Sequence, residues 1–341
     1  MKIITQTITN IMLTAVAGVV FALVSSIAIA VPKTICVFDP IGSNGPLYAE
    51  LKDYATAAIG WGVEFKMKPY TDERIASEDF KSGLCDAVSV TGIRGRQFNP
   101  FVGSIDSVGA LPSYDLLRDT VKTLSSTKAA RLMNVGDYEV VGIFPGGAVY
   151  LFVNDRSINN VASMSGKKIA ILDYDAAQIE IVKKVGASSV GSSLANMYSK
   201  FNNGSVDIVY GPGIMYEAME LYKGMEPDGG IIRFALAQLT IQVLIKSADF
   251  PEGYGQQSRD YVLSRFDHGV KILVDAENKI PATWWYDIEA TDISNYIELF
   301  RNIRISLRDA GIYDPKMMTV LRKIRCRKDP EKSECTAANK E

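Results

Sequence analysis

The sequence predicts an α/β protein made of two similar units that are followed by a mainly helical C-terminal region. Short apolar runs alternate with helical patterns in the order β-α-β-α-β between residues 34 and 90. The same alternation returns between residues 138 and 239, and helical periodicity dominates from residue 255 onward. Because strands that alternate with helices pair in parallel, each unit is expected to contain a parallel sheet.

Composition limits the classes of function. The chain has 341 residues, of which 47% are hydrophobic and 22% charged, as in ordinary globular proteins. The formal net charge of −2 offers no basic surplus for a nucleic-acid partner. His268 is the single histidine, so metal sites and acid–base catalysis built on histidine are poorly supplied, and we expect no metal or cofactor.

Residues 1–30 are predicted to be a signal peptide. Lys2 precedes an uncharged run from Ile11 to Val31, which contains the small-x-small pattern Ala28-Ile29-Ala30. The alternative is an uncleaved membrane anchor, because the run is long enough to span a bilayer. Cleavage after Ala30 would leave a soluble, periplasmic, monomeric protein.

The four cysteines agree with export. They form an even set in the mature part, for which three pairings exist, and we favour Cys36–Cys85 and Cys326–Cys335. The first two lie in short apolar runs that suit neighbouring strands, and the last two would close a local loop in a charged tail. Four reduced thiols are the alternative.

The elements of the first unit follow from local signals. A strand stops at Asp39-Pro40, and Ser43 or Asn44 is the expected N-cap of a helix that has Pro46 in its first turn. Apolar runs and helical spacing give the remaining boundaries: strand 34–38, helix 46–58, strand 63–67, helix 72–81 and strand 84–90.

The second unit and the C-terminal region are read in the same way. Pro145-Gly146-Gly147 divides two strands, and Pro212 is expected to open a helix that runs to Tyr222. The predicted elements are strands 140–144, 149–153, 168–172, 188–190, 206–210, 231–237 and 240–245, and helices 176–184, 194–201, 212–222, 255–275, 288–310 and 315–325.

Two α/β units joined by strands and followed by helices resemble a periplasmic solute-binding protein. Three segments are similar to the TRAP-type (DctP-like) periplasmic solute-binding proteins of tripartite ATP-independent transporters: Ser82–Ala87, Met164–Ile169 and Tyr198–Asp207. The resemblance implies a type II-like fold of two lobes with hinge strands and C-terminal helices. It divides the chain into a signal peptide at 1–30, a first lobe at 31–137 plus about 240–285, a second lobe at about 138–239, and C-terminal helices with a disulfide-tethered tail at 286–341.

Two departures from the family pattern concern the ligand. The family places a carboxylate-binding arginine where this chain has Ala170, and an asparagine where it has Gly211. The chain is therefore identified as a divergent branch that lacks the usual carboxylate anchor.

Loops at the carboxyl ends of the strands are the candidate ligand contacts, because ligands of such folds bind there. In the first lobe, Ser43 and Asn44 lie at a helix N-terminus, and Arg94 and Arg96 follow a strand. Their alternative roles are helix capping for the first pair and a solvated or hinge salt bridge for the arginines. In the second lobe the candidates are Tyr150, Asp173, Tyr174, Gln178 and Tyr210.

The predicted function is capture of a small, anionic solute, such as an organic acid, by closure of the two lobes. Delivery to a membrane permease follows from the family resemblance. The alternatives are an exported enzyme or a non-transport binding protein on the same scaffold. The sequence contains no Gly-x-Ser-x-Gly, Walker, His-Glu-x-x-His or Gly-x-Gly-x-x-Gly motif, so no catalytic residue is predicted.

Overall fold

A computed structural model describes residues 31–337 and residue 341; the predicted signal peptide lies outside them. The N-terminal part contains β1 (Val31–Phe38), η1 (Gly42–Asn44), α2 (Pro46–Ile59), β2 (Val63–Tyr70), α3 (Glu73–Lys81), β3 (Ala87–Thr91), α4 (Gly92–Gly95), α5 (Pro100–Gly103), α6 (Tyr114–Ser125), η2 (Thr127–Leu132) and β4 (Asn134–Val135). The middle part contains β5 (Tyr138–Val153), η3 (Ala162–Met164), β6 (Lys168–Leu172), α7 (Ala176–Lys184), β7 (Ser188–Ser192), α8 (Met197–Asn202), β8 (Ile208–Pro212), α9 (Met215–Ala218), α10 (Tyr222–Met225), β9 (Gly230–Ile232) and β10 (Ala237–Lys246). The C-terminal part contains η4 (Ser247–Asp249), α11 (Tyr254–Asn278), η5 (Ala282–Trp284), β11 (Trp285–Tyr286), α12 (Ala290–Asp309), α13 (Pro315–Lys328) and α14 (Ser333–Thr336).

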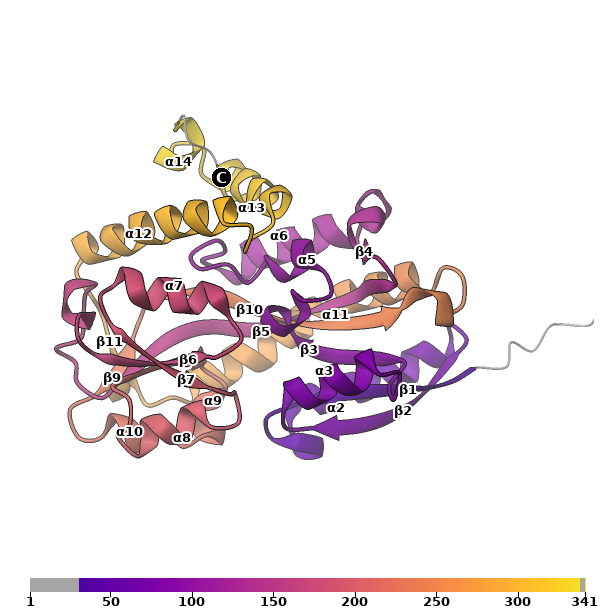
Figure 1. Ribbon diagram of the computed structural model, residues 1–341, viewed down its shortest axis with the longest axis horizontal. Helices are drawn as coiled ribbons and strands as arrows, with labels where there is room; N and C mark the ends of the chain where they lie inside the picture. The colour runs from indigo at the N-terminus through magenta and orange to yellow at the C-terminus, as the bar shows by residue number, and fades with distance from the viewer. Residues whose placement is uncertain (1–30, 338–340) are drawn as a thin grey trace, which may run out of the picture.

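The two lobes share one sheet, and each lobe contributes parallel strands to it, as the sequence predicts for each unit. The main path of strands runs β2-β1-β3-β10-β5-β8-β6-β7, with parallel pairing of β1 to β2 and β3 and of β6 to β7 and β8. In Figure 1 the first lobe, with β1–β3, α2 and α3, lies to the right, and the second, with β6–β8 and α7–α10, lies to the left. The exact lobe boundaries stay a prediction.

Strands β5 and β10 are the hinge strands. They pair with each other along the whole of β10, while β10 also pairs with β3 in the first lobe and β5 with β8 in the second. The prediction of two strands around Pro145 was wrong, because β5 runs through it. The pairing register shifts there, and such an irregular position tolerates a proline that cannot donate a ladder hydrogen bond.

The first lobe confirms most of the predicted elements and one of the predicted disulfides. Asp72 caps α3 by accepting a hydrogen bond from the Arg74 amide, and Cys36–Cys85 is buried within the lobe. The predicted N-cap of α2 was wrong: Gly45 holds that place and makes no side-chain cap. The buried Asp39 carboxylate instead accepts a hydrogen bond from the Tyr48 amide at 3.0 Å and satisfies the first turn.

The second lobe differs from the prediction in its later elements. Pro212 ends β8 rather than opening a helix, and two short helices, α9 and α10, replace the expected helix 212–222. The predicted strand 231–237 reduces to β9, which pairs with β5 and β11. Helix α7 begins as predicted, with Asp175 as its N-cap.

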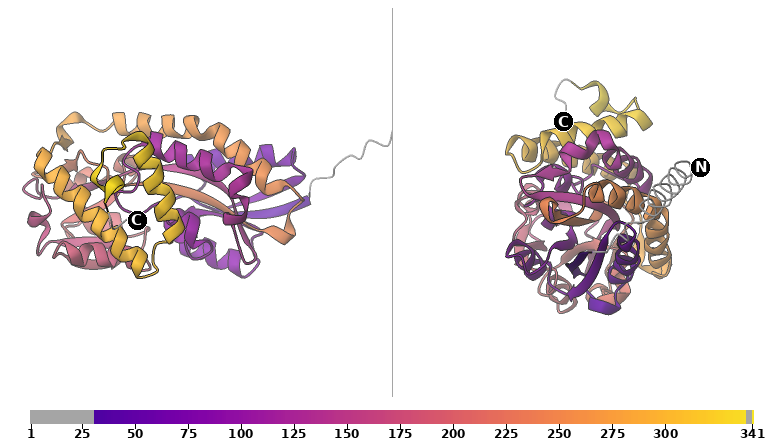
Figure 2. Two further views of the ribbon diagram at one scale, coloured as in Figure 1. Left: turned by 90° about the horizontal axis from the view of Figure 1, so that it is seen from above. Right: turned by 90° about the vertical axis from the view of Figure 1, so that its right-hand side faces the viewer.

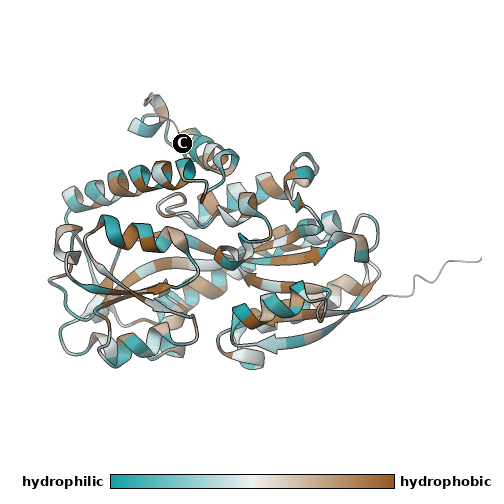
Figure 3. Cartoon of the chain, viewed as in Figure 1, coloured by the Kyte–Doolittle hydropathy of each residue, from teal (hydrophilic) through white to brown (hydrophobic). Residues whose placement is uncertain are grey.

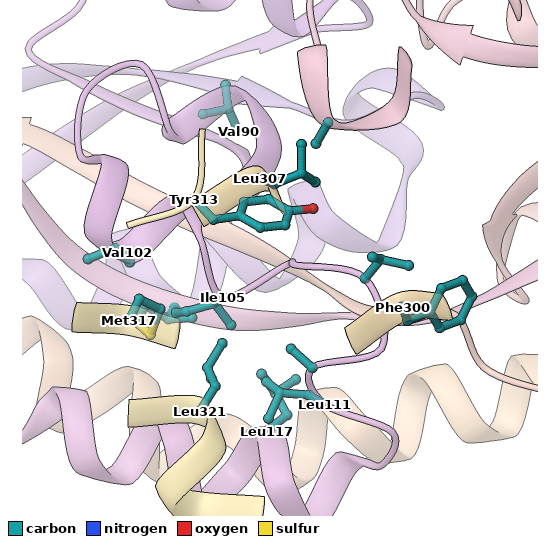
Figure 4. Packing of buried hydrophobic residues seen from close by; sticks show 14 of the residues in the cluster. Val90, Val102, Ile105, Leu111, Leu117, Phe300, Leu307, Tyr313, Met317 and Leu321 are labelled. Atoms are coloured by element: carbon teal, nitrogen blue, oxygen red, sulfur yellow. The ribbon is translucent and has the colours of Figure 1, made fainter. Parts of the chain in front are cut away.

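Helices α12 and α13 lie along one side of the molecule and contact both lobes (Figures 1 and 2). Helix α12 contacts α7 of the second lobe, and α13 contacts α5 and α6 beside the first. Figure 4 shows the apolar packing behind this arrangement, with Phe300, Leu307, Tyr313, Met317 and Leu321 of the C-terminal region against Val102, Ile105, Leu111 and Leu117. The C-terminal helices therefore brace the two lobes.

A buried cluster of charges, which we call the C-terminal clamp, holds the end of this brace. It consists of Arg304, Arg325, Glu334 and Glu341. Arg325 Nη2 lies 2.6 Å from Glu334 and 2.7 Å from Glu341, and Arg304 Nη2 lies 2.6 Å from Glu341. The predicted Cys326–Cys335 disulfide is confirmed beside it.

The apolar residues lie mainly in the sheet and on the helix faces that pack against it. Hydrophobic colouring concentrates on the central strands and on the inner faces of the helices in Figure 3. Within residues 31–337 no helix is both long and apolar enough to cross a membrane.

Candidate ligand-binding site

Two cavities lie between the lobes, and the larger of these two, with a volume of about 150 Å³, is called here the larger cavity. A separate cavity of about 380 Å³ lies away from them, beside Glu139 and the start of α11. The walls of the larger cavity come from the end of β3 and the loop before α6 in the first lobe, from β6, α7 and β8 in the second, and from α12. Most lining side chains are apolar. The polar members are Thr91, Asp106, Asp175, Gln178, Tyr198, Tyr210, Gln238, Tyr296 and Tyr313.

A smaller cavity of about 50 Å³ adjoins the larger one. The two share Thr91, Leu194, Tyr198, Pro212 and Leu239 as lining residues, so these side chains form a common wall between them. Side chains from both lobes therefore line this region between them.

Arg94 occupies the contact surface between the lobes. Its guanidinium stacks on the Tyr174 ring, with Cζ 3.4 Å from the ring centroid, and its Nε lies 3.7 Å from Glu73 Oε1. Tyr174 donates a hydrogen bond to the same Glu73 oxygen. Burial raises the pKa of Glu73, although the hydrogen bonds and the charge of Arg94 oppose the shift. Arg94 is thus compensated by Glu73.

Arg96 makes a second contact between the lobes. Its Nη1 lies 3.0 Å from Asp175 Oδ1 at the start of α7, and its Nε donates to the Gly103 carbonyl oxygen at 3.2 Å. Its guanidinium also faces the Tyr313 ring. We call the Glu73–Arg94–Tyr174 and Arg96–Asp175 contacts the interlobe latch.

Asp106 is a buried carboxylate on the cavity wall. It accepts hydrogen bonds from Thr240 Oγ1 at 2.7 Å and from the Thr240 amide at 3.2 Å. Within the described residues it has no cationic partner closer than 4.0 Å. Burial raises the pKa of Asp106 to about 7, while the hydrogen bonds and the charge of Arg96 oppose the shift.

Gln178 and Tyr210 come together on the second-lobe side. The Gln178 Oε1 atom accepts from the Leu172 amide at 2.7 Å and also from the Tyr210 hydroxyl. Burial raises the pKa of Tyr210 well above its usual value, so the hydroxyl stays neutral. Both residues line the larger cavity, and their role as ligand contacts stays a prediction.

The two departures from the family pattern have structural counterparts. A Cβ atom on Gly211 would lie 2.5 Å from the Tyr198 hydroxyl, so the tyrosine occupies the space that a side chain at this position would need. Ala170 is fully buried in the apolar core of the second lobe. Neither position leaves a polar side chain for an acid group.

Seven of the nine predicted site residues are not among those that line the larger cavity. Three of them, Arg94, Arg96 and Tyr174, form the interlobe latch, and the other four lie elsewhere. Ser43 and Asn44 are exposed in η1, and Asp173 is exposed at the end of β6. The Tyr150 hydroxyl donates to Glu277 at 3.3 Å, and its ring packs edge-on against Trp285. Their roles as ligand contacts stay predictions.

Four polar residues of the cavity wall are not among the residues predicted from the sequence: Asp106, Asp175, Gln238 and Tyr296. Asp106 lies in a loop region where no element was assigned. A signal for Gln238 was present, because Gln238, Thr240 and Gln242 alternate with apolar residues along a strand and so share one face. All three are buried.

The arrangement suits binding rather than an assigned chemical step. No group of three or more His, Cys, Asp or Glu side chains that could hold a metal is found in the described part of the chain. The enclosed space is mainly apolar with a few polar groups, which is the usual character of a small-molecule site.

Two solved structures with a similar fold are TRAP periplasmic solute-binding proteins. A TRAP periplasmic solute-binding protein from Desulfovibrio salexigens with bound orotic acid aligns at a TM-score of 0.70 and 17% identity, covering 87% of this chain and 99% of that one. A second, from Sulfitobacter sp. NAS-14.1 with bound β-D-galacturonate, aligns at a TM-score of 0.70 and 14% identity, covering 86% and 99%. These matches show the two-lobe fold.

The family follows from closer relatives. Residues 58–340 match the family described as solute-binding protein AdeT 1/2. The probable solute-binding protein AdeT1 of Acinetobacter baumannii is 45% identical over 298 residues, which cover 87% of this chain and 98% of that protein. The chain belongs to the AdeT 1/2 solute-binding protein family.

Proposed function

We propose that the protein is an exported receptor that encloses one small solute between its lobes and presents the closed form to the permease of a membrane transporter. The observation that supports this most directly is the larger cavity, which is lined from both lobes. Since the hinge strands continue through both lobes, opening would bend β5 and β10 and break the contacts of the interlobe latch. A ligand that contacts both walls would favour the closed state.

An organic acid is the ligand class that the sequence predicts, with Arg94 and Arg96 as anchors. The neighbours bound to orotic acid and galacturonate are consistent with that class. In the structure the two guanidinium groups face Glu73 and Asp175. An acid would therefore have to replace one of these carboxylates as the partner of an arginine.

The test starts from protein purified from the periplasm. Native mass spectrometry should detect one bound small molecule per chain, and its removal should lower Tm and enlarge the radius of gyration measured by small-angle X-ray scattering. The molecule should be recovered chemically unchanged after incubation. Conversion to a product would favour the exported-enzyme alternative, and the absence of any bound or Tm-raising solute would contradict the proposal.

A further inference from the structure

The wall of the larger cavity has an excess of negative charge. Asp106 and Asp175 both line it, and the charge of Arg96 acts on both carboxylates. When Asp106 is ionised, two carboxylates and one guanidinium leave one negative charge uncompensated. Among the described residues that line the cavity there is no Lys, Arg or His.

Hydrogen-bond acceptors without a donor lie on the same wall. Gln238 is 2% exposed, and its Oε1 atom has no hydrogen-bond partner in the described part of the chain. It lies two residues along β10 from Thr240, which is the hydrogen-bond partner of Asp106. The Tyr296 hydroxyl, also on the cavity wall, is buried and likewise without a partner there.

Such groups are costly when the cavity is empty. A buried acceptor that lacks a donor costs about 1–3 kcal/mol, and an unpaired buried charge costs more. A ligand that brings hydrogen-bond donors and one positive charge would satisfy both deficits. A carboxylate ligand would instead add a second net negative charge to this wall.

We propose that the larger cavity binds a small protonated amine with an apolar body, whose ammonium group is hydrogen-bonded to Asp106 and Gln238. The inference rests on the proposed function and specifies its ligand class. An ammonium group has three donors and no acceptor, which matches the acceptors on this wall. The volume of about 150 Å³ fits a body of about the size of a benzene ring.

Three probes of similar size test the charge directly. Benzylamine, benzyl alcohol and benzoate share a phenyl ring and differ in whether the polar group is cationic, neutral or anionic. Calorimetry on ligand-free protein at pH 8 should give benzylamine the tightest binding, at least about tenfold tighter than benzoate. Tighter binding of benzoate would overturn the amine inference and leave solute binding itself standing.

Variants locate the binding group. Asp106→Asn should lower the affinity for benzylamine at least about tenfold, because it removes only the charge. The same substitution should change the affinity for benzyl alcohol by less than about threefold. Gln238→Met tests a second residue of the same wall. It should lower the affinity for benzylamine more than the affinity for benzyl alcohol. Asp249→Asn, which removes an exposed carboxylate outside the cavity, is the matched control and should change neither affinity.

The remaining outcomes are also decisive. Benzylamine affinity that is unaffected in folded Asp106→Asn and Gln238→Met proteins would overturn the assignment to this wall. A failure of all three probes to bind at millimolar concentration, in protein whose co-purified solute is an anion, would overturn the ligand class. The proposed function fails separately, through the absence of any bound solute in periplasmic material.

Discussion

Arg94 lies beside the buried carboxylate of Glu73 and stacks on the ring of Tyr174. The side chain of Glu73 is 2% exposed, so removal of its cation leaves a buried carboxylate with hydrogen bonds but no opposite charge. The stacking contact to Tyr174 joins the two lobes. We therefore expect Arg94 to stabilise the folded protein and the contact between the lobes, whether or not it also binds a ligand.

Arg94→Ala should lower the free energy of unfolding by about 3 kcal/mol, measured by urea denaturation. The matched control is Arg74→Ala. Arg74 is an exposed arginine in the first turn of α3, next to Glu73, and its ion pair with Asp72 should contribute less than about 1 kcal/mol to stability. A loss in Arg94→Ala as small as that of the control, together with loss of benzoate binding, would contradict the latch and favour the predicted role as an acid anchor.

Asp106 should make the stability of the ligand-free protein depend on pH. Its pKa rises from 3.8 in the unfolded reference to about 7 in the folded protein, so ionisation is harder after folding. The associated stability is present below pH 3.8 and is lost as the pH rises to about 7, by up to about 4 kcal/mol. Asp106→Asn should flatten this part of the stability curve.

Urea denaturation at several pH values between 4 and 8 provides the measurement for Asp106. The buried Glu73, whose pKa is also raised, is retained in the variant. The difference between the stability curves of the variant and the unmodified protein therefore gives the contribution of Asp106 alone. Parallel curves for the variant and the unmodified protein would refute this contribution.

At the scale of the element, the C-terminal clamp holds a wall of the larger cavity. Arg304 Nη1 donates to the Val108 carbonyl oxygen at 2.9 Å, and Arg325 Nη1 donates to that of Ala110 at 2.9 Å. Val108 lines the cavity, and Asp106 lies two residues before it. Burial by itself would raise the pKa of Glu341, but the two arginines outweigh it and lower that pKa.

Arg325→Met should lower the free energy of unfolding by about 3–5 kcal/mol, because Glu334 and Glu341 would both lose a buried cation. Lys271→Ala is the control, since its exposed pair with Asp275 should contribute less than about 1 kcal/mol. Adding Glu334→Gln to Arg325→Met should recover part of the loss. Equal effects of Arg325→Met and Lys271→Ala would rule out a stabilising clamp.

Elements with strong local signals could be predicted from the sequence, and those set by tertiary contacts could not. Helix α3 has an Asp72 cap and regular spacing, so its limits were predicted closely. Helix α6 has the Ser113 cap and buried leucines that could have revealed it. The continuity of β5 through Pro145 could not be foreseen, since it depends on the partner strand β10.

At the scale of the whole molecule, the fold class, the two disulfides and the family follow from order and spacing along the chain. The ligand chemistry does not, because it depends on which charges neutralise one another across the lobes. Arg94 and Arg96 come from one lobe, and their partners Tyr174 and Asp175 come from the other. A single sequence lists these residues but does not show that they pair.

The position of β10 between β3 and β5 also affects how the chain acquires its structure. β3 ends at Thr91 and β10 begins at Ala237, so the first lobe lacks its neighbouring strand until about 150 further residues have been synthesised. Until then β3 presents an open edge that can pair with other chains. A chain that emerges from its N-terminus therefore cannot complete its first lobe before the second has been made, and it needs protection from aggregation during that interval.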